Sequence, residues 1–190
     1  GLLPLLVLAS LAPIYLLTNN ATKNFILILI TYLTVFLLFN LQVSQRIPKC
    51  FLGDAGSKLI GLFLGSIILV ASSSSLDEKA FRPATGLFFL SIFIFDFAST
   101  LVRRAYTSKP LMQPDRAHIH HLLQDLGVSR NQILLYLAGF QAFMSTFGYL
   151  LDGLAVADKY QFGWFMFAFA IYVIVLKKMW TVTMSTANSR

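Results

Sequence analysis

Long hydrophobic runs separated by short polar segments make up most of this chain. A helix that crosses the hydrocarbon core of a bilayer needs about 20 consecutive apolar residues, with a range of roughly 17–25. Several runs reach or approach this length, so the pattern predicts an all-α fold, a polytopic transmembrane helical bundle that forms one integral-membrane domain over residues 1–190. About six spans are predicted, at residues 2–17, 25–43, 59–71, 85–102, 133–151 and 162–176.

The predicted span at residues 59–71 is the shortest of these, with 13 residues. We expect it to tilt little, to extend into the serines that follow it, or to end inside the protein. Its Gly61 and Gly65 form a GxxxG pattern, which allows neighbouring helices to approach closely. Because this pattern is common, it indicates helix packing rather than a function.

The composition supports a membrane protein rather than a soluble one. Hydrophobic residues make up 57% of the 190 positions and charged residues 12%, whereas a soluble domain carries about 25% charged residues. The single cysteine, Cys50, excludes a disulfide framework and a multi-cysteine metal site. The net charge is +7, but no basic–aromatic interleaving or nucleic-acid module is recognisable, so we expect no nucleic-acid partner.

Lysine and arginine residues are concentrated in alternate polar segments. Three segments hold eleven of these residues, and the three alternate segments hold four. The basic-rich set is 44–58, 103–132 and 177–190, and the other set is 18–24, 72–84 and 152–161. Because cytoplasmic segments of membrane proteins carry the excess of positive charge, we predict cytoplasmic loops at about 44–58 and 103–132.

The first of these loops ends in the stretch FLGDAGSKLIG, residues 51–61. Gly53 and Gly56 flank Asp54, and glycines allow the backbone to turn sharply and to approach a ligand closely. A carboxylate here could hold Mg²⁺, while Lys58 and the amides at the start of the next helix could meet phosphate oxygens. The spacing does not match a Walker loop. A plain turn with an Asp or Ser helix cap is the alternative.

The second loop contains all three histidines of the chain, His118, His120 and His121, just after Arg116. Two of them on one face could bind zinc or another transition metal, although a closed zinc site is unpromising without cysteine. They could also hydrogen-bond phosphate oxygens beside the Arg116 guanidinium, or act as general acids and bases near neutral pH. The alternative is a set of solvated loop histidines.

Asp96 is the acidic residue that falls inside a predicted span. A carboxylate at membrane depth is costly unless it faces a wet cavity or a partner, so Asp96 is a candidate site residue. It lies about two helical turns before Arg103, toward the predicted cytoplasmic face. A hydrogen bond between packed helices is the alternative for Asp96, and anchoring at lipid headgroups is the expected role of Arg103 and Arg104.

The ordered set of FLGDAGS, a span ending in Arg-Arg, and PDRAHIHHLL followed by Gly127 resembles the bacterial polyprenyl-phosphate N-acetylhexosamine-1-phosphate transferases. These integral membrane enzymes start lipid-linked cell-envelope glycan synthesis. The most similar branch is that of the undecaprenyl-phosphate N-acetylglucosamine-1-phosphate transferases, of glycosyltransferase family 4. The related muramoyl-pentapeptide transferases usually carry three consecutive histidines where this chain reads His-Ile-His-His, and they are the alternative.

The resemblance implies an enzyme that transfers a sugar-1-phosphate, with N-acetylglucosamine-1-phosphate as the expected group, from a UDP-sugar to undecaprenyl phosphate and releases UMP. It also implies Mg²⁺ as cofactor, with Mn²⁺ as an alternative. The bacterial inner membrane, a cytoplasmic active site and a homodimer are further expectations from the family.

Residue roles follow from the same resemblance. Asp54 matches the family's catalytic, Mg²⁺-binding aspartate, and the three histidines match its cytoplasmic catalytic histidine motif. The residues expected to bind substrate are Arg116, Lys58, Gly53, Gly56 and Ser57.

Two acidic motifs of the family are absent from this sequence, an adjacent-acidic motif and an Asn-x-x-Asp-Gly stretch, which lie upstream of the others in the family. The chain therefore resembles a C-terminal half, and we predict that it is inactive alone. A small proton- or metal-coupled transporter is a rival reading, but it needs ionisable residues at midplane depth in several spans, where this chain offers Asp96. A non-catalytic assembly subunit is the third reading.

Overall fold

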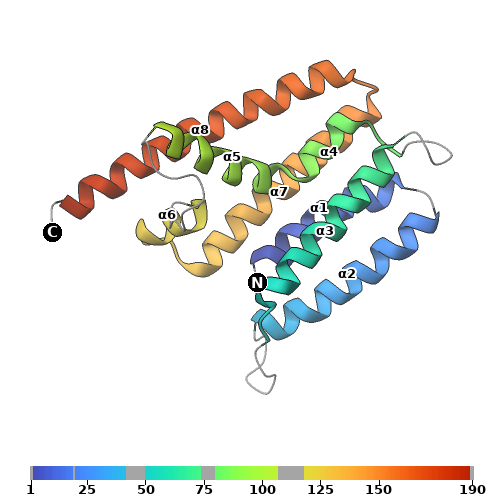
Figure 1. The fold of residues 1–190 in the computed structure, drawn as a ribbon, viewed down its shortest axis with the longest axis horizontal. Helices are drawn as coiled ribbons and strands as arrows, with labels where there is room; N and C mark the ends of the chain where they lie inside the picture. Colours follow the sequence, from blue (N-terminus) through green and yellow to red (C-terminus); the bar gives the residue numbers. More distant parts are fainter. Residues whose placement is uncertain (1, 19, 42–49, 74–79, 107–117, 189–190) are drawn as a thin grey trace.

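The computed structural model describes residues 2–18, 20–41, 50–73, 80–106 and 118–188, and these residues form helices and no strands (Figure 1). The all-α prediction is confirmed for this part of the chain. The helices are α1 (Leu2–Leu17), α2 (Asn20–Leu41), α3 (Gly53–Ser72), α4 (Pro83–Phe89), α5 (Ser91–Tyr106), α6 (Ile119–Asp125), α7 (Arg130–Gly153) and α8 (Asp158–Asn188).

Four helices are long and apolar enough to cross a membrane, and the bent pair of α4 and α5 makes a fifth when it is counted as one span. The prediction of about six spans is therefore slightly high. The difference is α1, whose 16 residues extend about 24 Å, less than the roughly 30 Å of a hydrocarbon core. The four are Thr22–Leu41, Gly53–Ser72, Arg130–Gly153 and Asp158–Val182.

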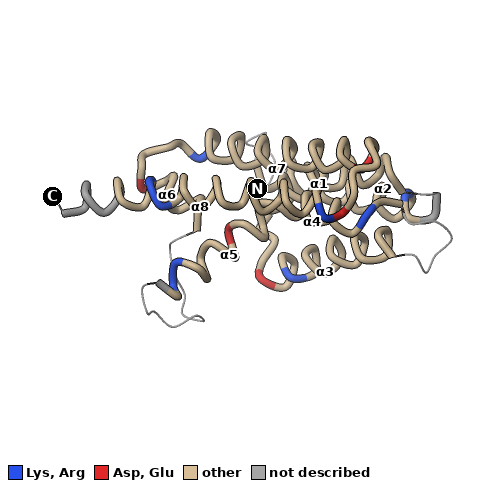
Figure 2. Tube along the Cα trace, turned by 90° about the horizontal axis from the view of Figure 1, so that it is seen from above, with Lys and Arg blue, Asp and Glu red and all other residues tan. Residues whose placement is uncertain are grey.

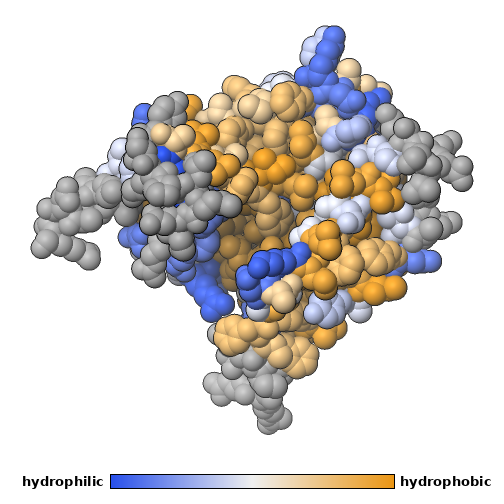
Figure 3. Space-filling model, in the orientation of Figure 1, coloured by the Kyte–Doolittle hydropathy of each residue, from blue (hydrophilic) through white to orange (hydrophobic). Residues whose placement is uncertain are grey.

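Apart from α5, the long helices lie roughly along one axis, which gives the bundle two ends (Figures 1 and 2). We call the end that carries helix α6 and the starts of α3 and α7 the histidine end. The other end, where α1, α3 and α7 finish, is called the far end. Hydrophobic side chains cover the middle of the visible surface, and hydrophilic ones gather toward the ends (Figure 3). This arrangement is that of a multi-pass membrane protein.

The predicted loop at 44–58 is shorter than expected, because α3 begins at Gly53. The span predicted at 59–71 is consequently a 20-residue helix. The predicted loop at 103–132 likewise contains the end of α5, all of α6 and the start of α7. Polar residues in the first turns of a helix do not stop it from forming, so hydropathy alone places these helix ends too late or too early.

The core consists of two hydrophobic clusters. One joins α1, α2 and α3 with Phe89 of α4, and the other joins α4 to α8 with Leu6 of α1. In the second cluster the fully buried ring of Phe95, on α5, lies 4.9 Å from that of Phe165 and 5.4 Å from that of Tyr172 on α8. Edge and tilted ring contacts at these distances are favourable beyond the area that they bury. They fix α5 against α8.

The span predicted at 85–102 is two helices, α4 and α5, which meet at an angle of 81°. A break inside the bilayer exposes backbone groups that must find partners in the protein. The buried Gln141 of α7 supplies them: its Oε1 accepts from the Ile92 amide at 3.0 Å, and its Nε2 donates to Phe89 O at 3.0 Å. The continuous span was a wrong prediction, because the residue that makes the break tolerable lies on another helix.

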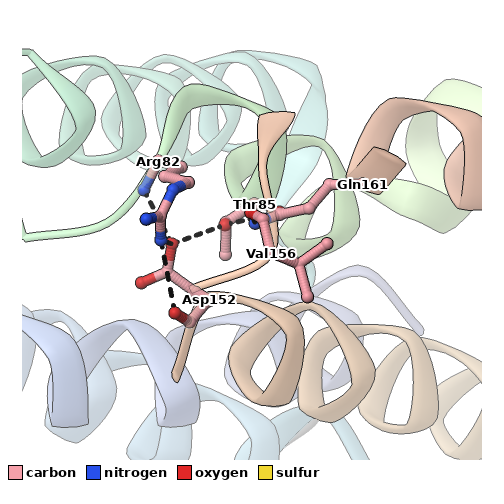
Figure 4. Close-up of polar contacts among 5 residues, drawn as sticks. All are labelled: Arg82, Thr85, Asp152, Val156 and Gln161. Carbon is pink, nitrogen blue, oxygen red and sulfur yellow. Dashed lines mark hydrogen bonds and ion pairs between the residues drawn. The ribbon is translucent and has the colours of Figure 1, made fainter. Parts of the chain in front are cut away.

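A second polar group, the far-end network, ties α4 to the α7–α8 connection (Figure 4). Asp152 Oδ1 accepts from the Arg82 amide at 3.0 Å and lies 3.4 Å from Arg82 Nη1. The Thr85 hydroxyl lies 3.0 Å from this same oxygen and 2.8 Å from Gln161 Oε1, so its one proton can go to either. Gln161 Nε2 donates to Val156 O at 2.9 Å. The network fixes where the bent pair starts.

Candidate functional site

The start of α3 is set by a glycine in the left-handed region. Gly53 has φ of +69°, a conformation that other residues adopt only with strain. The Ser57 hydroxyl donates to Gly53 O at 2.9 Å, one turn later. Gly56 packs on Leu52, since an added Cβ would come within 2.9 Å of Leu52 Cγ. The sharp turn expected at this stretch is therefore present, and it leads directly into a helix.

Asp54 and Lys58 form an ion pair across the first turn of α3, with Lys58 Nζ 2.8 Å from Asp54 Oδ2. Both side chains are almost fully exposed, at 88% and 78% respectively. An exposed pair at this spacing contributes little to stability. Both groups are consequently accessible to a ligand, and a carboxylate in the first turn also lies in the favourable field of the helix.

The three histidines lie together at the start of α6. His118 is the residue that precedes the helix, and His120 and His121 are in its first turn. The rings of His118 and His120 are stacked with centroids 6.0 Å apart, and those of His120 and His121 are 4.1 Å apart. The motif predicted as a loop is therefore a row of neighbouring imidazoles on the beginning of a short helix.

The end of this short helix is also fixed. Gly127 has φ of +81°, and the Val128 amide donates to Leu123 O at 3.0 Å across it. A left-handed glycine with such a bond is a common way to end a helix. Ser129 then caps α7 in a capping box with Gln132. The histidine segment is thus held between two defined helix ends.

Asp96 of α5 is the partner of this segment. Its Oδ2 lies 2.9 Å from His118 Nδ1, and its Oδ1 accepts from the Ile119 amide at 2.9 Å. The side chains of Asp96 and His118 are 21% and 39% exposed. The sequence marked Asp96 as a candidate without a role, and the structure joins it to the histidines.

Burial is the largest influence on the titration of His120 and lowers its pKa. The positive charges that His121 and His118 can carry lower this pKa further, whereas the carboxylate of Asp96 acts in the opposite direction. His120 therefore favours the neutral imidazole, which donates one hydrogen bond and accepts another.

The two predicted parts of the site share the histidine end but not a helix pair (Figure 2). Helix α6 packs on α7 and α8, whereas α3 packs on α1 and α4. Among the described residues no hydrogen bond or ion pair joins Asp54 to a histidine. Arg116 lies outside the described residues, so its expected role stays a prediction.

A divalent cation needs several oxygen, nitrogen or sulfur ligands close together. Within the described ranges no group of three or more His, Cys, Asp and Glu side chains could hold a metal ion, so a zinc site built from the histidines is not supported. Mg²⁺, however, is commonly bound by one or two carboxylates together with waters and substrate phosphates. The exposed carboxylate of Asp54 fits that role as one oxygen ligand, not as a closed site.

The chain is similar in sequence to several curated proteins. It is 31% identical over 156 residues to a protein of Haemophilus influenzae named "Undecaprenyl-phosphate alpha-N-acetylglucosaminyl 1-phosphate transferase". Proteins with this name from Pasteurella multocida and Escherichia coli K12 are 30% and 29% identical over 135 and 148 residues. This chain is homologous to part of these transferases.

These matches cover 80%, 71% and 77% of the chain but 43%, 37% and 40% of the relatives. The chain therefore spans about two fifths of the length of the transferases that it matches. No family model matches the sequence, and no solved structure matches it.

The structure joins candidate residues that the sequence did not connect. Asp96 could be found because an acidic residue inside a span is rare. Tyr172 of α8 could not be found: its buried hydroxyl lies close enough to Asp96 to interact with the carboxylate. A tyrosine in a hydrophobic span carries no sequence signal that separates this position from ordinary packing.

Proposed function

We propose that the chain forms part of an enzyme that transfers N-acetylglucosamine-1-phosphate from UDP-N-acetylglucosamine to undecaprenyl phosphate and releases UMP. The observation that carries the proposal is the homology to transferases of that name, together with the placement of their expected motif residues at one end of the bundle. The excess of Lys and Arg in the segments 44–58, 103–132 and 177–190 supports a cytoplasmic active site in the bacterial plasma membrane.

The proposed reaction is a displacement at the sugar-linked phosphorus of the donor. An oxygen of the lipid phosphate forms a bond to this phosphorus, the bond to the bridging oxygen breaks, and UMP leaves with that oxygen. Such phosphoryl transfers depend on positioning and on neutralising the developing charge more than on covalent chemistry by the protein. A membrane-embedded bundle with polar side chains at one end suits a water-soluble donor and a lipid acceptor.

The residue roles in this proposal follow from the contacts. The His118 ring donates to Asp96 with Nδ1, and in its protonated form Nε2–H donates to a phosphate oxygen of the donor. Lys58 exchanges the exposed Asp54 carboxylate for another phosphate oxygen. Arg116 is also expected to bind a phosphate oxygen. Asp54 then becomes available as an oxygen ligand for Mg²⁺, which, when bound, neutralises diphosphate oxygens and the leaving UMP.

The test uses the full-length product of the gene that encodes this chain, in membranes or detergent with undecaprenyl phosphate. Radiolabelled UDP-N-acetylglucosamine with Mg²⁺ is expected to yield labelled lipid and an equal amount of UMP. UDP-muramoyl-pentapeptide in parallel distinguishes the related transferase activity. Absence of labelled lipid and of UMP with both donors would overturn the proposal. The 190-residue chain by itself is expected to give no transfer.

A further inference from the structure

The contact between Asp96 and the histidine segment joins two parts of the molecule that are distant in sequence. Asp96 lies in the middle of α5, and its two oxygens reach the first residue of α6 and the residue before it, 23 and 22 positions later. Each oxygen is 2.9 Å from its partner nitrogen. The segment that carries the three histidines is consequently fixed to the bent span by one side chain.

We propose that Asp96 is a positioning residue that fixes the tautomer and orientation of His118, so that Nε2 faces the substrate as an acceptor in the neutral ring and as a donor to a phosphate oxygen in the protonated ring. A carboxylate is an acceptor, so the ring nitrogen that faces it, Nδ1, must carry a proton. In the neutral ring Nε2 is then the acceptor, and in the protonated ring the carboxylate stabilises the imidazolium. The consequence for catalysis rests on the proposed function, whereas the tautomer does not.

The same carboxylate has a second task, which the experiment must separate from the first. Asp96 Oδ1 accepts from the Ile119 amide at the start of α6, where His118, the residue before the helix, makes no side-chain cap. Loss of this bond would disturb α6 whatever the state of the imidazole. A useful variant must therefore keep the acceptor for Ile119 and change what faces His118.

The surroundings of Asp96 favour a fixed orientation of this carboxylate. Its helix is anchored by Phe95, which is fully buried against α8, and its side chain is 21% exposed. The buried hydroxyl of Tyr172 interacts with it electrostatically. Carboxylates that hydrogen-bond metal-ligating imidazoles orient the ring in a comparable way, and their loss commonly costs about 10- to 100-fold in metal affinity or activity.

Asp96→Asn separates the two tasks. The amide oxygen can still accept from the Ile119 amide, but the amide nitrogen donates to His118 Nδ1, which then cannot carry its proton. We expect the neutral ring to move its proton to Nε2. Nitrogen-15 NMR of histidine-labelled protein reads the protonated nitrogen directly, and the signals of His118 are assigned by their loss in His118→Asn.

The expected result is Nδ1–H in the parent protein and Nε2–H in Asp96→Asn, at a pH above the titration of the imidazole. The same tautomer in both proteins would overturn the proposal. So would an Nε2–H tautomer in the parent protein. Because this reading needs no substrate, it decides the role of Asp96 even if the protein turns out not to be a transferase.

The catalytic consequence is tested with the full-length protein. Asp96→Asn is expected to lower kcat about 10- to 100-fold, with a KM for the UDP-sugar close to that of the parent. In a His118→Ala background the same substitution is expected to cause no further loss, because both changes remove one function. Equal losses in both backgrounds would show that Asp96 acts independently of His118 and would overturn the proposal.

Discussion

Each end of the bundle carries a polar network centred on an aspartate. In each network the aspartate contacts a basic side chain and accepts a hydrogen bond from a backbone amide. In the far-end network Asp152 is 12% exposed, and the buried Thr85 and Gln161 are both hydrogen-bonded. At the histidine end Asp96 is similarly bound, but the partner ring is 39% exposed, and its Nε2 has no partner among the described residues.

The difference separates a structural network from one that can bind a ligand. A network in which every polar group has a hydrogen-bond partner stabilises one arrangement of helices and has no free donor or acceptor for a substrate. A network that is anchored on one side and open on the other orients a group and leaves it available. The first kind should therefore affect stability, and the second should affect activity.

The largest effect is expected from His118→Ala. Loss of the imidazole should lower the transferase rate of the full-length protein about 10²- to 10⁴-fold, the usual contribution of a positioned acid–base group. Thermal stability should change little, because the ring is partly exposed and makes one hydrogen bond to Asp96. The measurement is UMP release beside a melting curve. Full activity in this variant would show that the network at the histidine end is structural, like the far-end network.

Gln141→Leu extends the comparison to the bend between α4 and α5. The substitution leaves the Ile92 amide and the Phe89 carbonyl without their partner inside the bilayer, at a cost of about 3 kcal/mol in the free energy of unfolding. Unfolding by denaturant in micelles measures this loss. Asn131→Leu, at an exposed position of α7, is the matched control. Equal stabilities of the two variants would contradict the role of Gln141.

Asp152→Ala should break the far-end network. Arg82 and Thr85 would lose their shared acceptor, and we expect a loss of about 2 kcal/mol, since the Arg82 side chain is 30% exposed and partly compensated by water. The rate per folded molecule should be retained. The control is Asp158→Ala at the exposed start of α8, which should cost less in the same unfolding assay. A lower rate with unchanged stability would reverse the contrast between the two ends.

The smallest effect is a pH dependence from His120. Its pKa in the folded protein lies below 6.5, mainly because of burial, so the unfolded chain binds the proton first as the pH falls. Stability should therefore be complete above pH 6.5 and decrease below it. Asp96, His118 and His121 also act on this ring, so the test is the difference between parent and His120→Asn. Melting temperatures at about pH 7.5 and about pH 5.5 should differ less in the variant. An identical acid shift in both proteins would exclude His120 as its source.

The parts of the fold that follow from local composition could be predicted from the sequence. Hydropathy located the four apolar helices that are long enough to cross a membrane, together with the bent pair of α4 and α5. The topology inferred from Lys and Arg stays a prediction. The break at Leu90 could not be predicted, because no proline or glycine marks it and the compensating Gln141 lies 51 positions away. The early start of α3 was missed for a related reason, because its first residues are polar yet helical.

The residues of the candidate site stay a prediction, and their contacts could not be predicted from the sequence. The motif residues around Asp54 and the three histidines were identified, and both groups do lie at one end. The connection from Asp96 to His118 depends on how α5 is turned about its own axis, which follows from its packing on α7 and α8. A single sequence does not contain that rotation in any local pattern.

The 81° bend between α4 and α5 also has a consequence for the lipids around the protein. Helix α4 follows the bundle axis and α5 lies across it, within the half that ends in α6 (Figure 1). If the membrane normal follows the bundle axis, the pair is a re-entrant segment and α5 runs nearly parallel to the membrane plane. Its 16 residues then displace acyl chains from one leaflet over a length of about 24 Å, without a matching volume in the opposite leaflet. The molecule consequently has an asymmetric cross-section, and the two monolayers beside it must pack differently.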